Sequence, residues 1–324
     1  MKAAVIFKKG ETPQYVADFP TPIVQSENEL LISVKAAAIK NLDRLRAGGK
    51  HYSAQENNDK AEVIGGDGMG VLDDGTRVYA VGVSGMIAEK ALVEKDRMVQ
   101  LPADIDDATA AALPNAVMGS AMALRFRAAM QQGETVLING ATGVTGKIAV
   151  QLAKYYGAKK IIAAGRNEQS LQMLKTLGAD EIISLQQNDE AIVSQIKNSH
   201  SNAPINVVID YLWGRSAELI LSALRGNGTF SPRTRFITVG SMSGDVIQLS
   251  SSILRSVDLQ ISGSGIGSWT RDEVQKLITE ILPEMFRLAA DKKLKIDVET
   301  APLNDIAKAW NMKIAGGKRL VIIV

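Results

Sequence analysis

The sequence contains no cysteine and only two histidines, His51 and His200. The missing thiols exclude disulfides, iron–sulfur clusters and any zinc site built on thiolates. Neither sign of charge is in excess, because the formal net charge is +2 at pH 7, which gives no support for a nucleic-acid or membrane partner. No apolar run approaches the length of a membrane span, and the apolar segment 3–7 is too short for a signal peptide. We therefore expect a soluble, cytoplasmic protein.

The chain is long and apolar enough for one or two full domains, with 324 residues of which 46% are hydrophobic. Residues 1 to about 112 contain short β-type runs separated by turn residues. From residue 136 onward, apolar runs alternate with helical segments. Strands are expected at 136–139, 160–164, 181–184, 206–210, 235–240 and 257–263. Six strands with helices between them predict an α/β fold, a doubly wound parallel sheet with right-handed crossovers.

After this sheet, the pattern predicts a long amphipathic helix at about 271–290 and then a return to β character. The terminal run 320–324 has no neighbouring strand with which to pair, so we expect it to join the N-terminal β-rich segment. The predicted division is a discontinuous β-rich domain, 1–115 with 291–324, and a dinucleotide-binding domain, 116–290.

A glycine-rich turn between a predicted strand and a predicted helix is the most informative motif. Gly140, Gly143 and Gly146 are spaced three apart. The first permits a positive φ in the turn, the second lets a pyrophosphate approach backbone N–H groups, and the third lets the helix pack on the sheet. A β-branched residue at Gly143 is expected to crowd the pyrophosphate and to resist a positive φ. The turn residues expected to bind the cofactor are Gly140, Thr142, Gly143, Val144, Thr145 and Gly146. The alternative is a tight turn whose glycines serve packing alone.

The end of the second strand indicates which dinucleotide is bound. No acidic residue stands in Gly165-Arg166-Asn167 to accept the ribose 2′-hydroxyl of NAD. The planar guanidinium of Arg166 suits a 2′-phosphate instead. We therefore expect NADP(H), bound with the help of Arg166 and Asn167; the alternative is that Arg166 is a solvated loop cation.

Two later strand ends carry small residues where open parallel sheets bind ligands. We expect cofactor contacts there from Gly240, Ser241, Gly263, Ser264 and Gly265. Asp210 ends the fourth strand, and its expected role is either structural or close to the adenosine.

In order and spacing, eight segments resemble the medium-chain dehydrogenase/reductase superfamily, specifically its zinc-independent quinone oxidoreductase branch. They are 34–39, 65–70, 113–124, 140–154, 163–167, 177–180, 210–214 and 262–268. The resemblance covers essentially the whole chain. It implies a GroES-like domain, a Rossmann domain, and a cleft between them that holds NADP(H) and substrate.

The resemblance also implies roles for single residues. Asn41, with a one-residue uncertainty from Lys40, matches a position near the nicotinamide ribose. Ser120 stands next to the position of a hydroxyl beside the nicotinamide, which is Gly119 here. Tyr52 is either a proton donor or a wall residue of the acceptor site. A homodimer joined through the strand edge at 257–261 is expected as well.

The departures from the family concern zinc. Zinc-dependent members carry a cysteine near residues 38–43 and a Gly-His-Glu segment near 65–67; here the sequences are Ala-Ile-Lys-Asn-Leu-Asp and Gly-Gly-Asp. We therefore expect no metal. Without a Lewis acid, a quinone or an α,β-unsaturated carbonyl is a better hydride acceptor than an alcohol or ketone, because conjugation spreads the developing charge. The alternatives are a zinc-free alcohol or aldehyde reductase and a non-catalytic, crystallin-like NADPH-binding protein.

Overall fold

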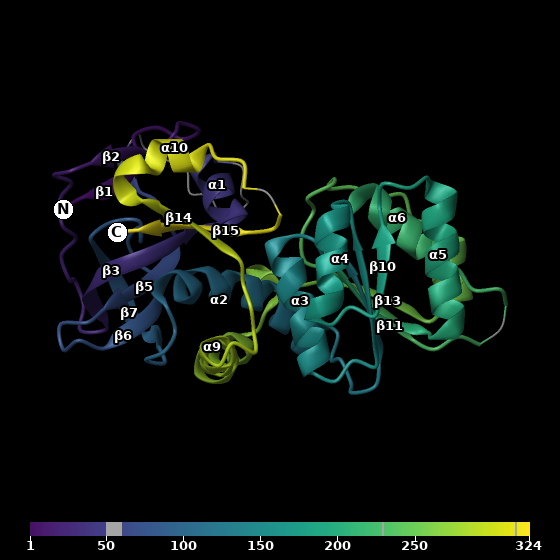
Figure 1. Ribbon diagram of the computed structural model, residues 1–324. Helices are drawn as coiled ribbons and strands as arrows, with labels where there is room; N and C mark the ends of the chain where they lie inside the picture. Colours follow the sequence, from purple (N-terminus) through teal and green to yellow (C-terminus); the bar gives the residue numbers. More distant parts are fainter. Residues whose placement is uncertain (50–59, 229, 315) are drawn as a thin grey trace. The chain divides into compact units, whose positions relative to one another are not determined.

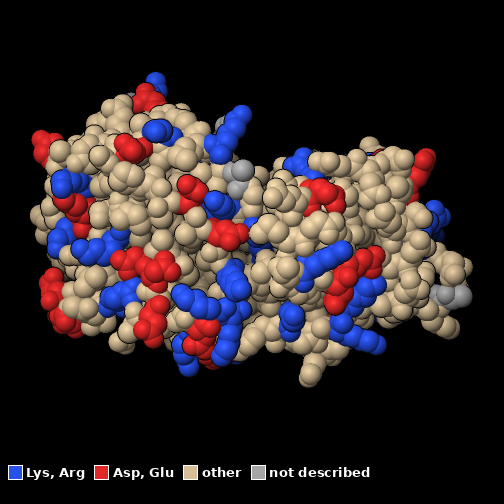
Figure 2. Space-filling view, viewed as in Figure 1, with Lys and Arg blue, Asp and Glu red and all other residues tan. Residues whose placement is uncertain are grey.

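The computed structural model describes residues 1–49, 60–228, 230–314 and 316–324 (Figure 1). It divides into two compact units, Met1–Asn115 with Lys276–Val324, and Ala116–Gln275. Basic and acidic side chains are interspersed on the face drawn in Figure 2, in keeping with the small net charge. Within the described residues, no helix is both long and apolar enough to cross a membrane.

The second unit is built on a six-stranded parallel sheet with the order β10-β9-β8-β11-β12-β13. Its strands are β8 (Thr135–Asn139), β9 (Lys160–Gly165), β10 (Glu181–Ser184), β11 (Ile205–Asp210), β12 (Thr234–Thr238) and β13 (Leu259–Gly263). Numbered within the sheet, this is the order 3-2-1-4-5-6 of a doubly wound fold, which confirms the predicted fold class. The order reverses between β8 and β11, so polar groups that follow these two strands lie at the switch point.

Helices connect these strands and cover the sheet. They are α3 (Val144–Tyr155), α4 (Glu168–Leu177), α5 (Asp189–Asn202), α6 (Gly214–Ala223) and the short α7 (Ser251–Ser256). α3 packs against α4, and α5 packs against α6 (Figure 1). Right-handed crossovers on either side of the reversal place these two pairs on opposite faces of the sheet. Because both faces are covered, β8 is buried along its whole length.

The first unit contains two sheets. A six-stranded sheet has the order β14-β15-β3-β5-β6-β7, with β3 also pairing with β7, and a three-stranded sheet has the order β2-β1-β4. The strands are β1 (Ala3–Ile6), β2 (Gln14–Val16), β3 (Glu29–Ile39), β4 (Glu62–Val63), β5 (Asp67–Val71), β6 (Arg77–Gly82), β7 (Lys90–Gln100), β14 (Val298–Pro302) and β15 (Arg319–Ile323). β15 pairs antiparallel with β3, which is the return of the terminal run expected from the sequence.

The helical parts of the first unit are short. Besides the segment 276–290, they comprise α1 (Asn41–Ala47), the start of α2 (Asp107–Met122), η4 (Leu303–Asp305) and α10 (Ile306–Trp310). α2 continues into the second unit and runs on as η1 (Ala123–Arg127).

Residues 276–290 lie with the first unit, whereas the sequence pattern places them with the dinucleotide-binding domain. The predicted long helix is divided into α8 (Arg271–Lys276), η3 (Leu277–Ile281) and α9 (Leu282–Ala290). η3 and α9 both contact β7, and the ring of Phe286 lies 5.8 Å from that of Tyr79 on β6. An amphipathic pattern shows that one face of a helix is buried, but it does not show which sheet buries it.

His200 gives the second unit a pH-dependent contact. Its Nδ1 accepts the backbone N–H of Ile205, the first residue of β11, at 3.1 Å. Burial lowers the pKa of His200 below its ordinary value of 6.5, so the folded state favours the neutral ring that can accept this bond. This contribution to stability is present above pH 6.5 and is lost as the pH falls through 6.5 toward the lower folded pKa.

We predict that His200→Asn flattens this pH dependence, because the amide oxygen accepts the same N–H and does not titrate. Between pH 7 and pH 5 the unmodified protein should lose about 1 kcal/mol more unfolding free energy than the variant, the worth of one hydrogen bond. Urea unfolding at both pH values measures the difference. Parallel pH profiles for the two proteins would contradict the assignment.

Candidate functional site

The three glycines of the turn between β8 and α3 have three separate geometries. Gly140 has φ 89°, a conformation that side chains rarely adopt. At Gly146 an added Cβ would lie 2.4 Å from the carbonyl oxygen of Gly140, so only glycine allows α3 to come this close to the turn. Gly143 has φ −76°, and the expected positive φ at this position is therefore wrong. An added Cβ there would meet only the Gly140 oxygen, at 3.5 Å, so the fold itself does not require glycine at 143.

The N-terminus of α3 has no side-chain cap. The comparable helices α4 and α5 do have one, since Asn167 accepts the N–H of Ser170 and Asn188 accepts that of Ala191. In α3 the first-turn N–H groups of Val144 and Thr145 therefore lack the side-chain oxygen that usually satisfies such donors. Gly143 is exposed and these two residues are partly exposed. Open donors at the positive end of a helix dipole form a site for an anion.

The end of β9 places a free cation on the same edge of the sheet. Arg166 is exposed and forms no hydrogen bond or ion pair with any residue that the structure describes. Gly165, directly before it, is buried, and an added Cβ would lie 2.6 Å from the side chain of Thr142 in the glycine-rich turn. The turn and the end of β9 are thus in contact. Asn167 uses its Oδ1 to cap α4 at 2.7 Å, so that oxygen has a structural role.

The switch point is held by a buried carboxylate. Asp210, the last residue of β11, accepts the N–H groups of Leu212 and Trp213 at 3.0 and 3.1 Å, and the side-chain amide of Asn139 at 2.7 Å. Burial raises the pKa of Asp210 above its ordinary value, and these three hydrogen bonds oppose the rise. Trp213 has φ 56°, which is unfavourable for a non-glycine residue and is held by these bonds. Of the two roles expected for Asp210, this geometry supports the structural one.

The Ser120 hydroxyl is fully engaged inside the second unit. Its Oγ donates to the carbonyl of Ala116 at 2.8 Å or to that of Thr145 at 3.0 Å, and it lies 3.1 Å from the phenol oxygen of Tyr211. Ser120 has no exposed surface. Burial raises the pKa of the Tyr211 phenol, with the Ser120 hydrogen bond acting in the opposite direction. In this structure Ser120 joins α2 to α3 and is not open to a ligand, in contrast to the expected cofactor contact.

The remaining strand-end residues differ in accessibility. Gly240 lies against Tyr211, where an added Cβ would be 3.1 Å from the carbonyl oxygen. Ser241 and Gly263 are exposed. Ser264 is buried and its Oγ accepts the indole N–H of Trp269 at 3.2 Å. Gly265 donates its backbone N–H to the Ser268 hydroxyl at 2.9 Å.

The sheet register brings most of these positions to one edge. Ser184 is opposite Gly165, Asn139 is opposite Ala164 and Asp210, and Thr238 is opposite Asp210 and Gly263. The turn 140–146, Arg166, the turn 240–241 and the turn 263–265 all follow these carboxyl ends, where open α/β sheets bind ligands.

The residues expected near the reacting groups lie elsewhere in the chain. Asn41 is exposed and begins α1 of the first unit. Tyr52 and His51 lie outside the described residues.

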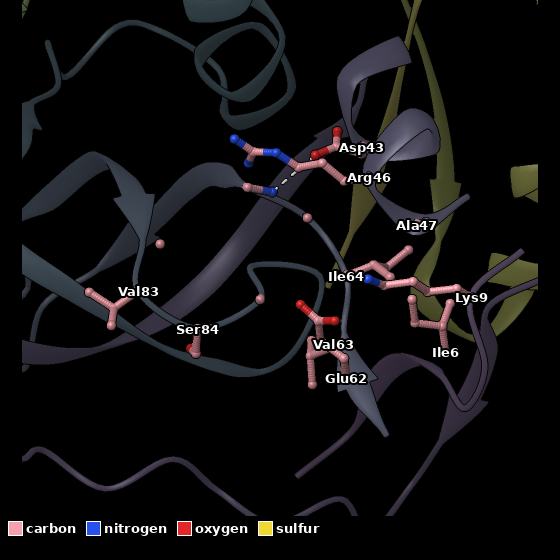
Figure 3. Close-up of a pocket in the computed structure, with 14 residues that line it drawn as sticks. Ile6, Lys9, Asp43, Arg46, Ala47, Glu62, Val63, Ile64, Val83 and Ser84 are labelled. Atoms are coloured by element: carbon pink, nitrogen blue, oxygen red, sulfur yellow. Dashed lines mark hydrogen bonds between the residues drawn. The ribbon is translucent and has the colours of Figure 1, made fainter. Parts of the chain in front are cut away.

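A buried ionic cluster in the first unit was not foreseen from the sequence. The Lys40 ammonium lies 3.2 Å from the Asp43 carboxylate and also pairs with Asp67. The cluster borders a cavity of about 430 Å³ beside α1, whose wall includes Arg46 and Gly66 (Figure 3). The dashed line in Figure 3 joins the N–H of Gly66 to Asp43, a distance of 3.1 Å. The signal available in the sequence was a lysine at the end of an apolar strand, with aspartate three residues later.

Comparisons with known proteins identify relatives over the whole chain. A family model described as zinc-binding dehydrogenase matches residues 144–282. A probable NADPH-dependent quinone reductase of Emericella nidulans is 26% identical over 100% of both chains. A quinone oxidoreductase of Sus scrofa is 29% identical over 86% of this chain and 84% of its own length.

Solved structures share the fold. A mycobacterial quinone oxidoreductase superposes with a TM-score of 0.84 at 19% identity, covering 100% of both chains. A quinone oxidoreductase from Thermus thermophilus, whose structure was also solved in complex with NADPH, gives 0.78 at 24% identity over 100% of both chains.

The fit of a zinc ion is poor despite the description of the family model. The chain has no cysteine, and in the part of the chain that the structure describes no group of three His, Cys, Asp or Glu residues could hold a metal. The Asp43 and Asp67 carboxylates already pair with an ammonium.

We predict that Gly146→Ala destabilises the protein by about 1–3 kcal/mol, because the new methyl overlaps backbone that cannot move away. Gly143→Ala is the matched control: it meets no backbone clash and should cost less, about 0.5–1 kcal/mol, because alanine is a poorer N-cap residue than glycine. Urea unfolding without ligand measures both. Equal losses for the two variants would show that the close approach at 146 has no special role.

Proposed function

We propose that this chain, which belongs to the quinone oxidoreductase-like branch of the medium-chain dehydrogenase/reductase superfamily, is an NADPH-dependent oxidoreductase. Its substrate would be a quinone or an α,β-unsaturated carbonyl, which it would reduce without zinc. The observation that carries the proposal is the uncapped N-terminus of α3 next to the end of β9, where Arg166 is unpaired among the described residues. Together they provide an anion site and a separate cation at the ligand-binding edge of a doubly wound sheet.

The residues present fit NADP(H). The first-turn N–H groups of α3 would hold the pyrophosphate, and the missing side chain of Gly143 leaves room for it. Arg166 would pair with the 2′-phosphate through its planar fork. The exposed Ser241 and Gly263 offer further contacts along the same edge. When bound, NADPH supplies the hydride from its reduced nicotinamide.

The relatives support this cofactor. One relative is named a probable NADPH-dependent quinone reductase, and structures with the same fold were solved in complex with NADPH. The protein would then contribute alignment of the donor with the acceptor, a term that can supply a large part of a rate enhancement.

A conjugated acceptor is favoured by the chemistry of the first unit. Reduction of an ordinary ketone benefits from a Lewis acid at the carbonyl oxygen, whereas the two buried carboxylates here are paired with Lys40. A quinone or enone spreads the developing charge itself. Asn41, as a contact to the nicotinamide ribose, and Tyr52, as donor or wall residue, stay predictions.

Two other functions and an assembly state also stay predictions. The alternatives are a zinc-free alcohol or aldehyde reductase and a non-catalytic NADPH-binding protein. A homodimer would use β13, which pairs only with β12 among the described strands and so presents an open edge. A cytoplasmic location is likewise a prediction.

The function is tested by following NADPH oxidation against quinones, enones, aldehydes and alcohols, each with and without EDTA. We expect quinones or enones to give the highest kcat/KM and EDTA to leave it unchanged. Turnover restricted to alcohols, or lost with EDTA, would overturn the proposal. Tight NADPH binding without turnover of any acceptor would favour the non-catalytic alternative.

We predict that Arg166→Ala weakens NADPH binding roughly 10- to 150-fold, the loss of one charge-assisted phosphate contact. NADH binding should hardly change, because NADH has no 2′-phosphate. Fluorescence titration with both cofactors measures this. Lys175→Ala, which removes an exposed cation from the opposite end of α4, is the control and should affect neither cofactor. Equal losses of NADPH and NADH affinity in Arg166→Ala would count against the phosphate role.

Tyr52→Phe tests whether hydride alignment suffices without a proton donor. The ring is kept and only the hydroxyl is lost, so quinone turnover should fall modestly, and enone turnover should fall more because an enolate must be protonated. An essential acid contributes about 10²–10⁴-fold. A loss above about 10³-fold in kcat with a quinone at saturating NADPH would make the phenol essential.

A further inference from the structure

The acidic centre of the first unit consists of Asp43 and Asp67 with Lys40 between them, and each of its four carboxylate oxygens has a hydrogen-bond or ion-pair partner. Asp43 Oδ1 accepts the N–H of Gly66 at 3.1 Å, and Asp43 Oδ2 accepts the N–H of Lys40 at 2.8 Å and also lies 3.2 Å from its ammonium. Asp67 Oδ1 pairs with the same ammonium, while Asp67 Oδ2 accepts the Tyr79 hydroxyl at 2.7 Å. Lys40, Asp43 and Asp67 are each at most 6% exposed. Two carboxylates from α1 and β5 therefore converge on one nitrogen.

The charges in this centre balance. Burial alone lowers the pKa of Lys40, but the Asp43 and Asp67 carboxylates together outweigh it, so the pKa of Lys40 is raised. Burial also raises the pKa of Tyr79, helped by Asp67, so the phenol stays a neutral donor. Arg319, buried on β15, is a second cation that interacts with both carboxylates and donates to Asn115 at 3.1 Å. Two cations and two anions give no net charge, which buried groups require.

The position of this centre bears on zinc. The family resemblance implies that zinc-dependent members carry a cysteine near residues 38–43 and a Gly-His-Glu segment near 65–67, and in this chain the same two segments supply Lys40, Asp43 and Asp67. The cation at their meeting point is an ammonium on a flexible stem, with three donors for the oxygens around it. A divalent ion bonded to the carboxylates at about 2.0–2.2 Å would have to displace it.

We propose that the Lys40 ammonium is the resident cation of this carboxylate site and occupies the position from which a divalent ion would have to bridge Asp43 and Asp67. The inference extends the metal independence in the proposed function, and it concerns only the first unit. The positive charge of the Lys40 ammonium balances the carboxylates of Asp43 and Asp67. Because a side chain of the protein already occupies the position between them, the site binds no divalent cation.

The test compares Lys40→Ala and Lys40→Met with the unmodified protein. Removing one partner of a buried ion pair leaves the other uncompensated, so the unfolding equilibrium constant should rise roughly 10²–10³-fold in both variants. The matched control is Lys90→Ala, whose ammonium bonds the neutral Ser33 hydroxyl at 2.8 Å, and it should not show this loss.

Zinc sulfate is the probe of the emptied site. With the lysine stem gone, water can enter beside the Asp43 and Asp67 carboxylates and supply the remaining ligands, so Lys40→Ala should bind zinc weakly in equilibrium dialysis and recover part of its stability as zinc is added. The unmodified protein and Lys90→Ala should do neither. Adding Asp67→Asn to Lys40→Ala should abolish the uptake.

Any one of three results would overturn the proposal. They are stoichiometric zinc in the unmodified protein, unchanged stability in Lys40→Ala, or a loss of stability in Lys40→Ala that zinc does not reduce. Should Lys40→Ala fail to fold, Lys40→Met with Asp67→Asn removes one charge of each sign. Better folding of that pair than of Lys40→Met supports the proposal, and no improvement overturns it. These readouts are stability and metal content, so a failure here is separate from an absence of NADPH oxidation.

Discussion

The approach of helix α3 to the end of strand β8 is the contact on which the second unit depends. A Cβ at Gly146 would lie 2.4 Å from the Gly140 oxygen, so the helix can start this close to the sheet only because the side chain is absent. That closeness directs the first-turn N–H groups to the carboxyl edge of the sheet, where the ends of β9, β11, β12 and β13 also lie. The ligand site follows from backbone packing, and a few side chains then select the ligand.

The two units differ in whether their key polar groups have partners within the protein. At the sheet edge, donors are left without a side-chain partner: α3 has no cap, and Arg166 is unpaired among the described residues. In the first unit each oxygen of Asp43 and Asp67 has a partner, and the ammonium between them is almost fully buried. Donors without a partner in the protein can bind a ligand. A neutral cluster whose polar atoms are all hydrogen-bonded stabilises the fold instead and offers a ligand no open donor or acceptor.

This contrast explains how part of the chain can match a family model described as zinc-binding dehydrogenase while the acidic residues of the first unit do not fit zinc. The family model matches residues 144–282, which lie largely in the sheet with the glycine-rich turn. The acidic centre lies outside that range, on α1 and β5. The sheet with its glycine-rich turn and the acidic centre are thus on separate segments of the chain.

Local features could be predicted from the amino-acid sequence alone, because they depend on residues close together in the chain. The roles of Gly140 and Gly146, the strands of the parallel sheet and the position of Arg166 directly after the second strand all follow from spacing and periodicity. Features that depend on distant partners required the folded chain. Asp67 is 27 residues from Lys40, and Tyr211 is 91 residues from Ser120; no local pattern encodes either pairing. The same reason explains why 276–290 lies against β7 and why the Ser120 hydroxyl is closed to a ligand. Periodicity specifies that a face is buried, and only the folded chain specifies against what.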